Sequence, residues 1–375
     1  MGRTLVITND FPPRPGGIQS FVHGLVSRLP SDSVVVLTSA WRGSQEFDQA
    51  QDFPVVRVKS TVLLPGPRAT RLAKELMRQY DCDRVLFGAA APLGLMAPAL
   101  RKAGAVRCIG ITHGHEAGWT RWPIARQFIR SLGARLDAMT YLGEYTRSAI
   151  ADAIGPQRAT GLVQLTPGVD PDMFSPDVDG SAVRERYDLG QRPVIVCVSR
   201  LMPRKGQDVL IEAMPSVLAH VPAVALLIVG GGPHRQKLMK KVSELGLTTS
   251  VIITGSVPWD HLPAHYAAGD VFAMPCRTRL RGLDVEGLGI VYLEASATGL
   301  PVIGGRSGGA PDAVLEGVTG HSVDGNDAAC LAASLVELLT DHNRAGQMGQ
   351  AGRAWVQEKW TWSTQLDKLT SILAG

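Results

Sequence analysis

Several features are scarce or absent in this sequence, and each absence narrows the class of protein. The five cysteines include no C-x-x-C pair and several sit in apolar runs, which predicts reduced, buried thiols and not a disulfide framework. No run of about 18 apolar residues occurs, so no membrane-spanning helix is expected. The first residues form a short apolar stretch that ends at Asn9-Asp10, which favours a β-strand over an export signal. These features are typical of a cytoplasmic protein.

The length and the charge distribution are the first informative features that are present. At 375 residues the chain is longer than one domain with a single hydrophobic core usually is. Because domains usually contain roughly 100–200 residues, two domains are expected. Glycine is abundant, at 41 residues, as expected for tight strand-to-helix turns. Residues 1–165 hold 20 Lys and Arg against 12 Asp and Glu, whereas residues 166–375 hold 18 against 22. The basic first half predicts an anionic partner for that half.

Short β-branched runs alternate with longer helical patterns, which predicts buried parallel strands in βαβ units. The expected strands are Thr4–Thr8, Val34–Thr38, Val55–Val58, Arg84–Gly88, Val106–Thr112, Ala138–Leu142, Val194–Ser199, Ala225–Gly230, Val251–Thr254, Val271–Met274 and Pro301–Gly304. Two such series predict an α/β protein of two Rossmann-like, doubly wound parallel-sheet domains with a cleft between them. Pro and Gly interrupt the pattern at 165–171, so the domains are expected at residues 1–168 and 169–354. A last helix is expected from about Ala345 to Gly375, and its part from about residue 355 onward is expected to pack back on the first domain.

Ligands of open parallel sheets bind beyond the carboxyl ends of the strands. After the first strand, Gly16 and Gly17 open a helix, whose free N–H groups attract phosphate. After the first strand of the second domain, Arg200 and Lys205 carry the charges that would clamp a diphosphate and stabilise it as a leaving group. A plain loop-to-helix turn and a solvated basic loop are the alternatives without a ligand.

Two further segments of the second domain point to the same ligand. Gly230 ends a strand in a Gly-Gly-Gly run that lacks the G-x-G-x-x-G spacing, which argues against a nicotinamide enzyme. Glu286 and Glu294 flank a glycine-containing turn and a helix start, whose free N–H groups would face a ligand. Glu286 would reach a sugar hydroxyl and Glu294 the hydroxyls of a ribose. Two unlinked surface glutamates are the alternative.

These residues resemble those of retaining GT-B glycosyltransferases (group 1, family four). Glu286 and Glu294 match the E-x7-E motif of that family. The segment from Arg200 to Lys205 matches its phosphate-binding R-x4-K segment, and Asn9 to Gly17 matches its N-terminal Gly-Gly loop. The resemblance covers nearly the whole chain and is closest to the GDP-mannose-dependent phosphatidylinositol monomannoside mannosyltransferases, which act on a glycolipid at the cytoplasmic membrane face.

The resemblance implies a role for each matching position. The first domain would bind the acceptor and the second the nucleotide sugar. The implied catalytic residues are Glu286, His113, Arg200 and Lys205. The implied donor-binding residues are Gly16, Gly17, Arg200, Lys205, Gly230, Ser256, Val257, Gly287, Leu288, Gly289, Ile290, Val291 and Glu294, and the implied acceptor-binding residues are Asn9, Asp10 and Gln19.

The implied mechanism retains the anomeric configuration and needs no metal or other cofactor besides GDP-mannose as co-substrate. The donor phosphate would accept the proton of the acceptor on one face of the sugar, while the protein positions the groups and stabilises charge. His113 would orient the sugar or donate a hydrogen bond to it. D-x-D sequences beginning at Asp81, Asp170 and Asp177 fit a metal-dependent transferase less well, because they are expected in loops or caps.

Other functions remain open at this point. Another retaining transferase with a UDP-sugar donor, a nucleotide-sugar 2-epimerase and a non-catalytic nucleotide-sugar binder would share the fold. The binder would be expected to have lost one of Arg200, Lys205 or Glu286, and all three are present. Consumption of the donor only when an acceptor is present would separate a transferase from the epimerase and the binder.

A basic segment suggests a membrane partner. Residues 117–136 hold no acidic residue, two tryptophans and the arginines Arg121, Arg126, Arg130 and Arg135. Apolar residues recur there at helical spacing, which fits either a core-packing helix with a basic solvent face or a surface that rests on anionic lipid. The second interpretation predicts peripheral association with the inner face of the plasma membrane.

Overall fold

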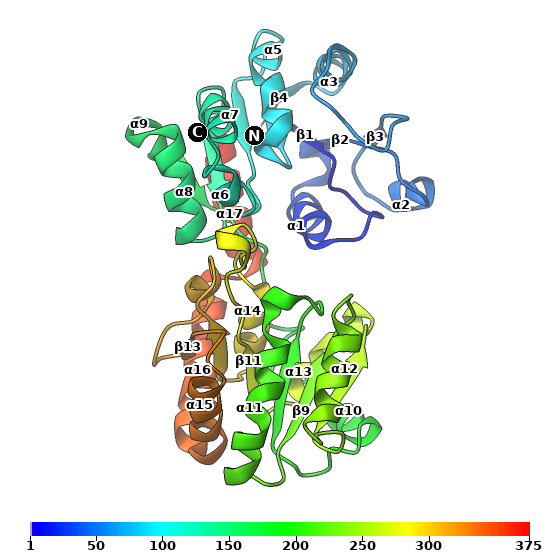
Figure 1. The fold of residues 1–375 in the computed structure, drawn as a ribbon. Coiled ribbons are helices and arrows are strands. Elements are labelled where there is room, and N and C mark those ends of the chain that lie inside the picture. The colour runs from blue at the N-terminus through cyan, green and yellow to red at the C-terminus, as the bar shows by residue number, and fades with distance from the viewer. Residues whose placement is uncertain (1) are drawn as a thin grey trace. The chain divides into compact units, whose positions relative to one another are not determined.

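The computed structural model describes residues 2–375 and consists of two α/β units (Figure 1). The first unit comprises the chain through Gly168 together with Trp362–Gly375, and the second comprises Val169–Thr361. Each unit is built on one parallel sheet, as the alternation of β-branched runs and helices predicts.

The first unit contains a seven-stranded sheet in the order β3-β2-β1-β4-β5-β6-β7, and every strand pair in it is parallel. Its strands are β1 (Arg3–Thr8), β2 (Val34–Thr38), β3 (Val55–Arg57), β4 (Cys82–Phe87), β5 (Arg107–Gly110), β6 (Ala138–Tyr141) and β7 (Leu162–Gln164). Its helices are α1 (Gly17–Val26), α2 (Ser44–Gln49), α3 (Pro67–Gln79), α4 (Ala90–Leu93), α5 (Ala97–Arg101), α6 (Glu116–Trp119), α7 (Pro123–Gly133), α8 (Glu144–Ile154), α9 (Pro156–Ala159) and α17 (Trp362–Ala374).

The second unit contains a six-stranded parallel sheet in the order β10-β9-β8-β11-β12-β13. Its strands are β8 (Val194–Val198), β9 (Ala225–Val229), β10 (Val251–Gly255), β11 (Val271–Met274), β12 (Val302–Gly305) and β13 (Gly320–Val323). Its helices are α10 (Ser181–Arg186), α11 (Gln207–His220), α12 (Arg235–Glu244), α13 (Leu262–Ala267), α14 (Ile290–Ala297), α15 (Ala328–Thr340) and α16 (His342–Lys359). The central strands β8, β9 and β11 are fully buried, so this sheet is covered by helices on both faces.

Helix α17 belongs to the first unit although the whole second unit precedes it in the chain. The guanidinium groups of Arg84 and Arg107 donate to the carbonyls of Leu373 and Ile372, at 2.7 and 2.6 Å. Trp362 lies so close to Gly24 of α1 that any side chain at Gly24 would overlap its ring. The helix is therefore held at both ends, by α1 at its start and by β4 and β5 at its end.

The structure differs from the sequence-based expectations at a few elements. Every expected strand is present, with ends that differ by at most two residues, and β7 and β13 are additional. The single helix expected from about residue 345 is two helices, α16 and α17, because the chain leaves the helical conformation at Trp360 and Thr361. Four cysteines are buried free thiols as expected, but Cys330 is exposed near the start of α15.

Candidate active site

The predicted site residues form two groups, one at the carboxyl edge of each sheet. In the first unit, the loops after β1, β4 and β5 carry the group, and these three strands are neighbours in the sheet. Asp10 follows β1, and its carboxylate accepts a hydrogen bond from the Gln19 amide at 2.7 Å. The side-chain amide of Asn9 donates to and accepts from the backbone of Leu63. Asn9 therefore holds the loop after β3, while Asp10 and Gln19 form a polar pair.

Gly16 and Gly17 lie at the start of α1, and they differ in backbone conformation and in the space around them. Gly16 has a φ of 153°, and a Cβ atom there would meet the Gln19 side chain at 2.2 Å, so its glycine is required by the fold. A Cβ atom on Gly17 would meet nothing within 4 Å. The first turn of α1 has no acidic residue and no side-chain cap. The free N–H groups of this turn are thus open to an anionic group.

His113, which was predicted to be catalytic, follows β5, and a hydrogen bond to the backbone holds its ring. Nε2 lies 2.6 Å from the carbonyl oxygen of Gly88, the residue that follows β4. A carbonyl only accepts, so Nε2 carries the proton, and in the neutral ring Nδ1 is left as an acceptor. Burial lowers the pKa of His113, while Glu116 and the Gly88 hydrogen bond oppose the shift. The neutral ring can therefore accept a hydrogen bond from a hydroxyl at Nδ1 more readily than donate one.

Glu116 is a buried carboxylate that sequence reasoning did not single out. One of its oxygens accepts the backbone N–H of His113 at 3.0 Å. The other lies 3.7 Å from Nε2 of His115 and has no hydrogen-bond partner among the described residues. The His115 ring stacks on that of His113, with centroids 6.3 Å apart. Glu116 thus closes the turn that presents His113.

In the second unit, the centre of the group is an ion pair between Lys205 and Glu286. Nζ of Lys205 lies 2.7 Å from Oε2 of Glu286, and the two residues are only 8% and 6% exposed. Gly206, with a φ of 75°, passes so close to the Pro275 carbonyl that a side chain there would overlap it. This close passage sets Lys205 at the end of β8. A buried pair of this kind places a cation and a carboxylate where they can bind phosphate and sugar hydroxyls.

Arg204 and Arg200 flank this pair in different ways. Arg204 lies 3.4 Å from the carboxylate of Asp284 and 3.7 Å from that of Glu286, so it extends the ion pair into a network. Arg200 is exposed, and its side chain forms no hydrogen bond or ion pair with any residue in the described part of the chain. It remains available to an anionic ligand.

The loops after β9 and β10 lie beside the one after β8. A side chain at Gly230 would overlap the carbonyl of Ser199, and one at Gly231 would overlap the Ser256 hydroxyl. The Gly230 N–H also donates to the Gly255 carbonyl at 2.9 Å. These glycines therefore allow close contact between loops of the protein itself, and Ser256 and Val257 end up at the same sheet edge as Lys205.

Helix α14 carries the second glutamate. It begins after Gly289, which has a φ of 83°, and its first turn has neither an acidic residue nor a side-chain cap. Glu294, one turn further along, accepts a hydrogen bond from the Tyr266 hydroxyl at 2.6 Å. Burial raises the pKa of the Glu294 carboxyl to about 7, and the Tyr266 hydrogen bond opposes the shift. The segment Gly287 to Val291 thus presents backbone N–H groups between two carboxylates.

The site contains residues for which the sequence held little signal. Arg204 lies inside the R-x4-K segment, so its charge could have been noted there. Tyr266 lies on α13 and reaches Glu294 only through the fold. Ser307, buried after β12, accepts the Glu286 N–H at 3.3 Å. Such contacts join residues distant in sequence, which no local spacing reveals.

The acidic and histidine side chains of the described residues can be compared with the needs of a metal site. Within residues 2–375, no three His, Cys, Asp or Glu side chains are grouped so that they could hold an ion. Each D-x-D sequence has an acid with a partner inside the protein: Asp83 pairs with Arg84, Asp170 accepts backbone N–H groups of its own turn, and Asp177 accepts the Ser175 hydroxyl.

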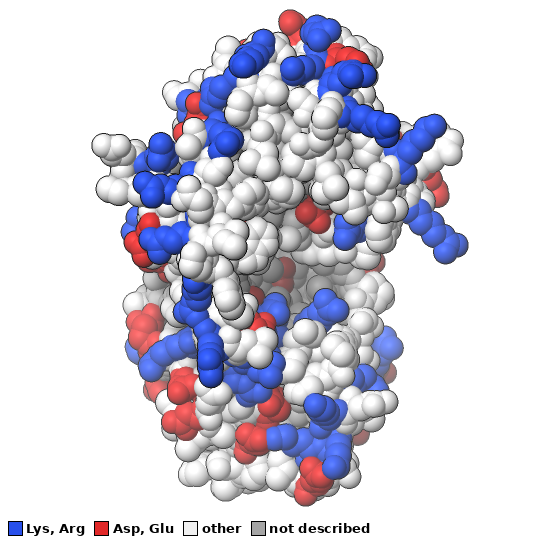
Figure 2. All heavy atoms as spheres, turned by 45° about the horizontal axis from the view of Figure 1, so that its top comes forward, with Lys and Arg blue, Asp and Glu red and all other residues white. Residues whose placement is uncertain are grey.

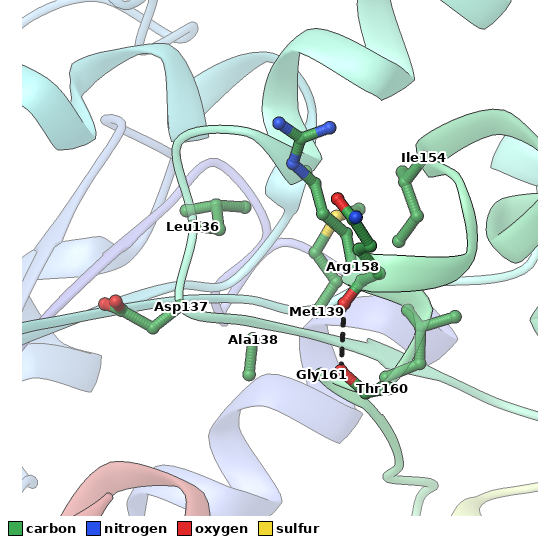
Figure 3. Close-up of a pocket in the computed structure, with 11 residues that line it drawn as sticks. Leu136, Asp137, Ala138, Met139, Ile154, Arg158, Thr160 and Gly161 are labelled. Atoms are coloured by element: carbon green, nitrogen blue, oxygen red, sulfur yellow. Dashed lines mark hydrogen bonds between the residues drawn. The ribbon is translucent and has the colours of Figure 1, made fainter.

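A pocket of about 230 Å³ lies at the opposite edge of the first sheet (Figure 3). It is lined by residues around the amino ends of β6 and β7, among them Met139, Ile154 and Gly161. The carboxylate of Asp137 points away from Ile154 and Arg158 in Figure 3 and pairs with Arg101 at 2.6 Å. Its charge is thus used within the protein, and the pocket is separate from the candidate site.

The basic segment forms α6 and α7, and its apolar stripe is part of the core. Ile129, Leu132 and Leu136 are buried against the first sheet, so the stripe is a packing face. The most exposed large apolar side chains of the segment are instead Trp122, at 61%, and Ile124, at 89%. Over the first unit, the upper part of Figure 2, Lys and Arg side chains gather more densely than Asp and Glu. In the described residues, no helix is long and apolar enough to span a membrane.

Comparisons with known proteins agree with this architecture. Residues 15–173 match the family described as "Glycosyltransferase Family 4", and residues 182–355 match "Glycosyl transferases group 1". The structure of HepE of Anabaena in complex with UDP has a TM-score of 0.83 at 20% identity and covers 99% of both chains. WaaG, a glycosyltransferase of lipopolysaccharide biosynthesis, has a TM-score of 0.68 at 19% identity, over 99% of this chain and 100% of its own.

Two curated relatives are much closer in sequence. The GDP-mannose-dependent α-(1-6)-phosphatidylinositol monomannoside mannosyltransferase of Mycolicibacterium smegmatis is 50% identical over 99% of this chain and 98% of its own. The enzyme of Corynebacterium glutamicum, named for a monoacylated form of that acceptor, is 44% identical over 99% and 97%. The two parallel-sheet units and the two family matches define a glycosyltransferase. Within that class, the chain belongs to the family of the phosphatidylinositol monomannoside mannosyltransferases.

Proposed function

We propose that this enzyme transfers mannose from GDP-mannose to a phosphatidylinositol mannoside, with retention of the anomeric configuration, at the cytoplasmic face of the membrane. The observation that carries the proposal is the 50% identity to the Mycolicibacterium smegmatis enzyme over nearly the full length of both chains. The Lys205–Glu286 pair and the Glu294 carboxyl supply the chemistry that such a donor requires.

The roles of the residues follow from their charge and position. Lys205 and Arg200 bind the diphosphate and stabilise it as the mannose bond breaks. Glu286 accepts hydrogen bonds from mannose hydroxyls, and Glu294 accepts them from the ribose. Backbone groups at Ser256 and Val257 pair with the base. In the first unit, Gly17 opens the start of α1 to phosphate, and Asp10, Gln19 and His113 bind hydroxyls of the acceptor and the sugar.

The reaction needs no protein nucleophile under this proposal. The bond between the mannose anomeric carbon and the β-phosphate oxygen breaks, and the acceptor oxygen bonds to that carbon on the same face. The acceptor's proton passes to an oxygen of the departing phosphate. The protein contributes positioning and fixed positive charge at that phosphate.

The proposal includes independence from divalent metals, because lysine and arginine take the place that a metal would have at the diphosphate. Transfer should continue in excess EDTA at an undiminished rate. Loss of activity in EDTA that Mn²⁺ or Mg²⁺ restores would contradict this part of the proposal.

The experiment that tests the function is a donor and acceptor panel with product analysis. GDP-mannose, GDP-glucose and their UDP counterparts are each supplied with and without phosphatidylinositol monomannoside. We expect GDP-mannose to be consumed only with the acceptor, and the product to carry a new α-linked mannose. Donor conversion without acceptor would indicate an epimerase, and binding without turnover would indicate a non-catalytic protein.

A further inference from the structure

A short loop of the second unit leaves two leucines exposed beside the candidate site. The loop Arg279–Asp284 follows β11 at the carboxyl edge of the sheet. Leu280 is 65% exposed and Leu283 is 50% exposed. The Leu283 N–H donates to the Leu280 carbonyl at 3.2 Å, so both leucines belong to one tight turn.

The loop is held in a costly conformation by contacts at its base. Leu280, Arg281 and Gly282 have φ angles of 49°, 54° and 88°, and the first two are rare values for residues with side chains. Arg279 and Asp284 pair through two backbone hydrogen bonds and through an ion pair of 3.6 Å. A conformation of this kind persists only where the surroundings hold it, and such positions gather at ligand-binding sites.

The same loop is connected to the proposed sugar-binding carboxylate. Asp284 accepts from Arg204, and Arg204 in turn lies beside Glu286, which pairs with Lys205. The loop that carries the two leucines is therefore linked through Asp284 and Arg204 to Glu286, the carboxylate proposed to bind the transferred sugar. Asp284 is also only two residues from Glu286 in the chain, so the loop lies next to the place proposed for the sugar, to which the acceptor must bring its hydroxyl.

We propose that Leu280 and Leu283 contact the acyl-bearing part of the acceptor and give the enzyme its preference for an acylated substrate. This inference rests on the proposed function and deepens it by naming a specificity element. A lipid acceptor has an apolar portion that gains by leaving water. Two leucines on a loop that cannot collapse into the core offer a fixed apolar contact for it.

The test compares two acceptors with the same headgroup. Phosphatidylinositol monomannoside with long acyl chains and its deacylated glycerophosphoinositol form are assayed at saturating GDP-mannose. The L280N/L283N variant should lose about tenfold in kcat/KM with the acylated acceptor and keep its activity with the deacylated one. The KM for GDP-mannose should be unchanged. L280M/L283M, which keeps the apolar contact, should retain the preference.

Leu245, at the end of α12, provides the matched control because it is also an exposed leucine, at 42%. L245N should behave as wild type with both acceptors. Equal losses of L280N/L283N with both acceptors, or no loss, would overturn the proposal. So would a wild-type dimer in sedimentation that the variant abolishes, because the leucines would then serve a second copy. A wild-type chain that uses neither acceptor would contradict the proposed function itself, and the loop proposal would fall with it.

Discussion

Lys205 and Glu286 are the residues whose chemistry is most tightly coupled. Each neutralises the other in a mostly buried position, so removal of one leaves an uncompensated charge. In the proposed complex, the lysine turns to the diphosphate and the glutamate to the sugar. Arg204 lies 3.7 Å from the Glu286 carboxylate, so a second cation stands beside the same glutamate.

K205A should lower kcat/KM by a factor that corresponds to about 2–4 kcal/mol, because a cation at the leaving phosphate is lost. Steady-state kinetics with GDP-mannose measure the effect, and a melting curve separates it from unfolding. K240A removes a surface lysine that pairs with Glu244 on α12, so it serves as the control. Unchanged kcat/KM in K205A would remove Lys205 from the site.

Glu294 predicts a pH dependence of donor binding. Its pKa, raised by burial from 4.5 to about 7, means that the folded carboxyl keeps its proton where an unfolded one would not. The contribution of Glu294 to the free energy of unfolding is therefore most favourable below pH 4.5, and it falls as the pH rises towards 7. A ribose is bound best by the ionised form, so the Kd for GDP should decrease as the pH rises through about 7.

Calorimetric titration with GDP between pH 6 and 8 measures this dependence. E294Q, which cannot ionise, should bind more weakly and show a flatter profile across the same range. A wild-type profile that matches that of E294Q would show that this carboxyl does not control binding.

At the scale of elements, the two glycines at the start of α1 should respond differently to alanine. G17A adds a methyl group where the structure has open space, so the melting temperature should hardly change. The methyl group would nevertheless intrude where a phosphate approaches the helix start, and kcat/KM should fall by about tenfold. G16A should lower the melting temperature, because Gly16 has a φ of 153°, which residues with side chains rarely adopt. Full activity in G17A would argue against a phosphate at this helix.

The properties of single helices and strands explain how much of the fold could be predicted from the sequence. Buried central strands are continuous apolar runs, so their positions could be predicted from the sequence pattern. β7 and β13 were missed because they lie at sheet edges, are short, and are partly exposed or contain Gly and His. The helix break at Trp360 had no proline or glycine to mark it. The candidate site residues were predicted from motifs, and their roles stay predictions. The contacts of Arg204 with Asp284 and of Tyr266 with Glu294 join distant parts of the chain, so only the fold creates them.

At the scale of the whole molecule, the basic first unit predicts salt-sensitive binding to anionic membranes. Arg121, Arg126 and Arg130 lie beside the exposed Trp122 and Ile124. Each such charge contributes roughly 1 kcal/mol near an anionic surface, and salt screens it. Co-sedimentation with vesicles should therefore require anionic lipid and weaken at high salt.

The R121Q/R126Q/R130Q variant should lose most of this binding. K237Q/K240Q, which removes exposed positive charge from α12 in the second unit, is the control and should bind as wild type. Equal binding of wild type to neutral and anionic vesicles would mean that α7 serves only the core of the first unit.

The return of α17 to the first unit has a consequence for the order in which the protein can fold during synthesis. The second unit is one continuous segment, whereas the sheet of the first unit is covered by a helix that the ribosome makes only after all of Val169–Thr361. Until then the surface around Gly24 that Trp362 fills remains uncovered. The first unit to be translated is thus the last to be completed, and the nascent chain carries an unfinished apolar surface while the second unit forms.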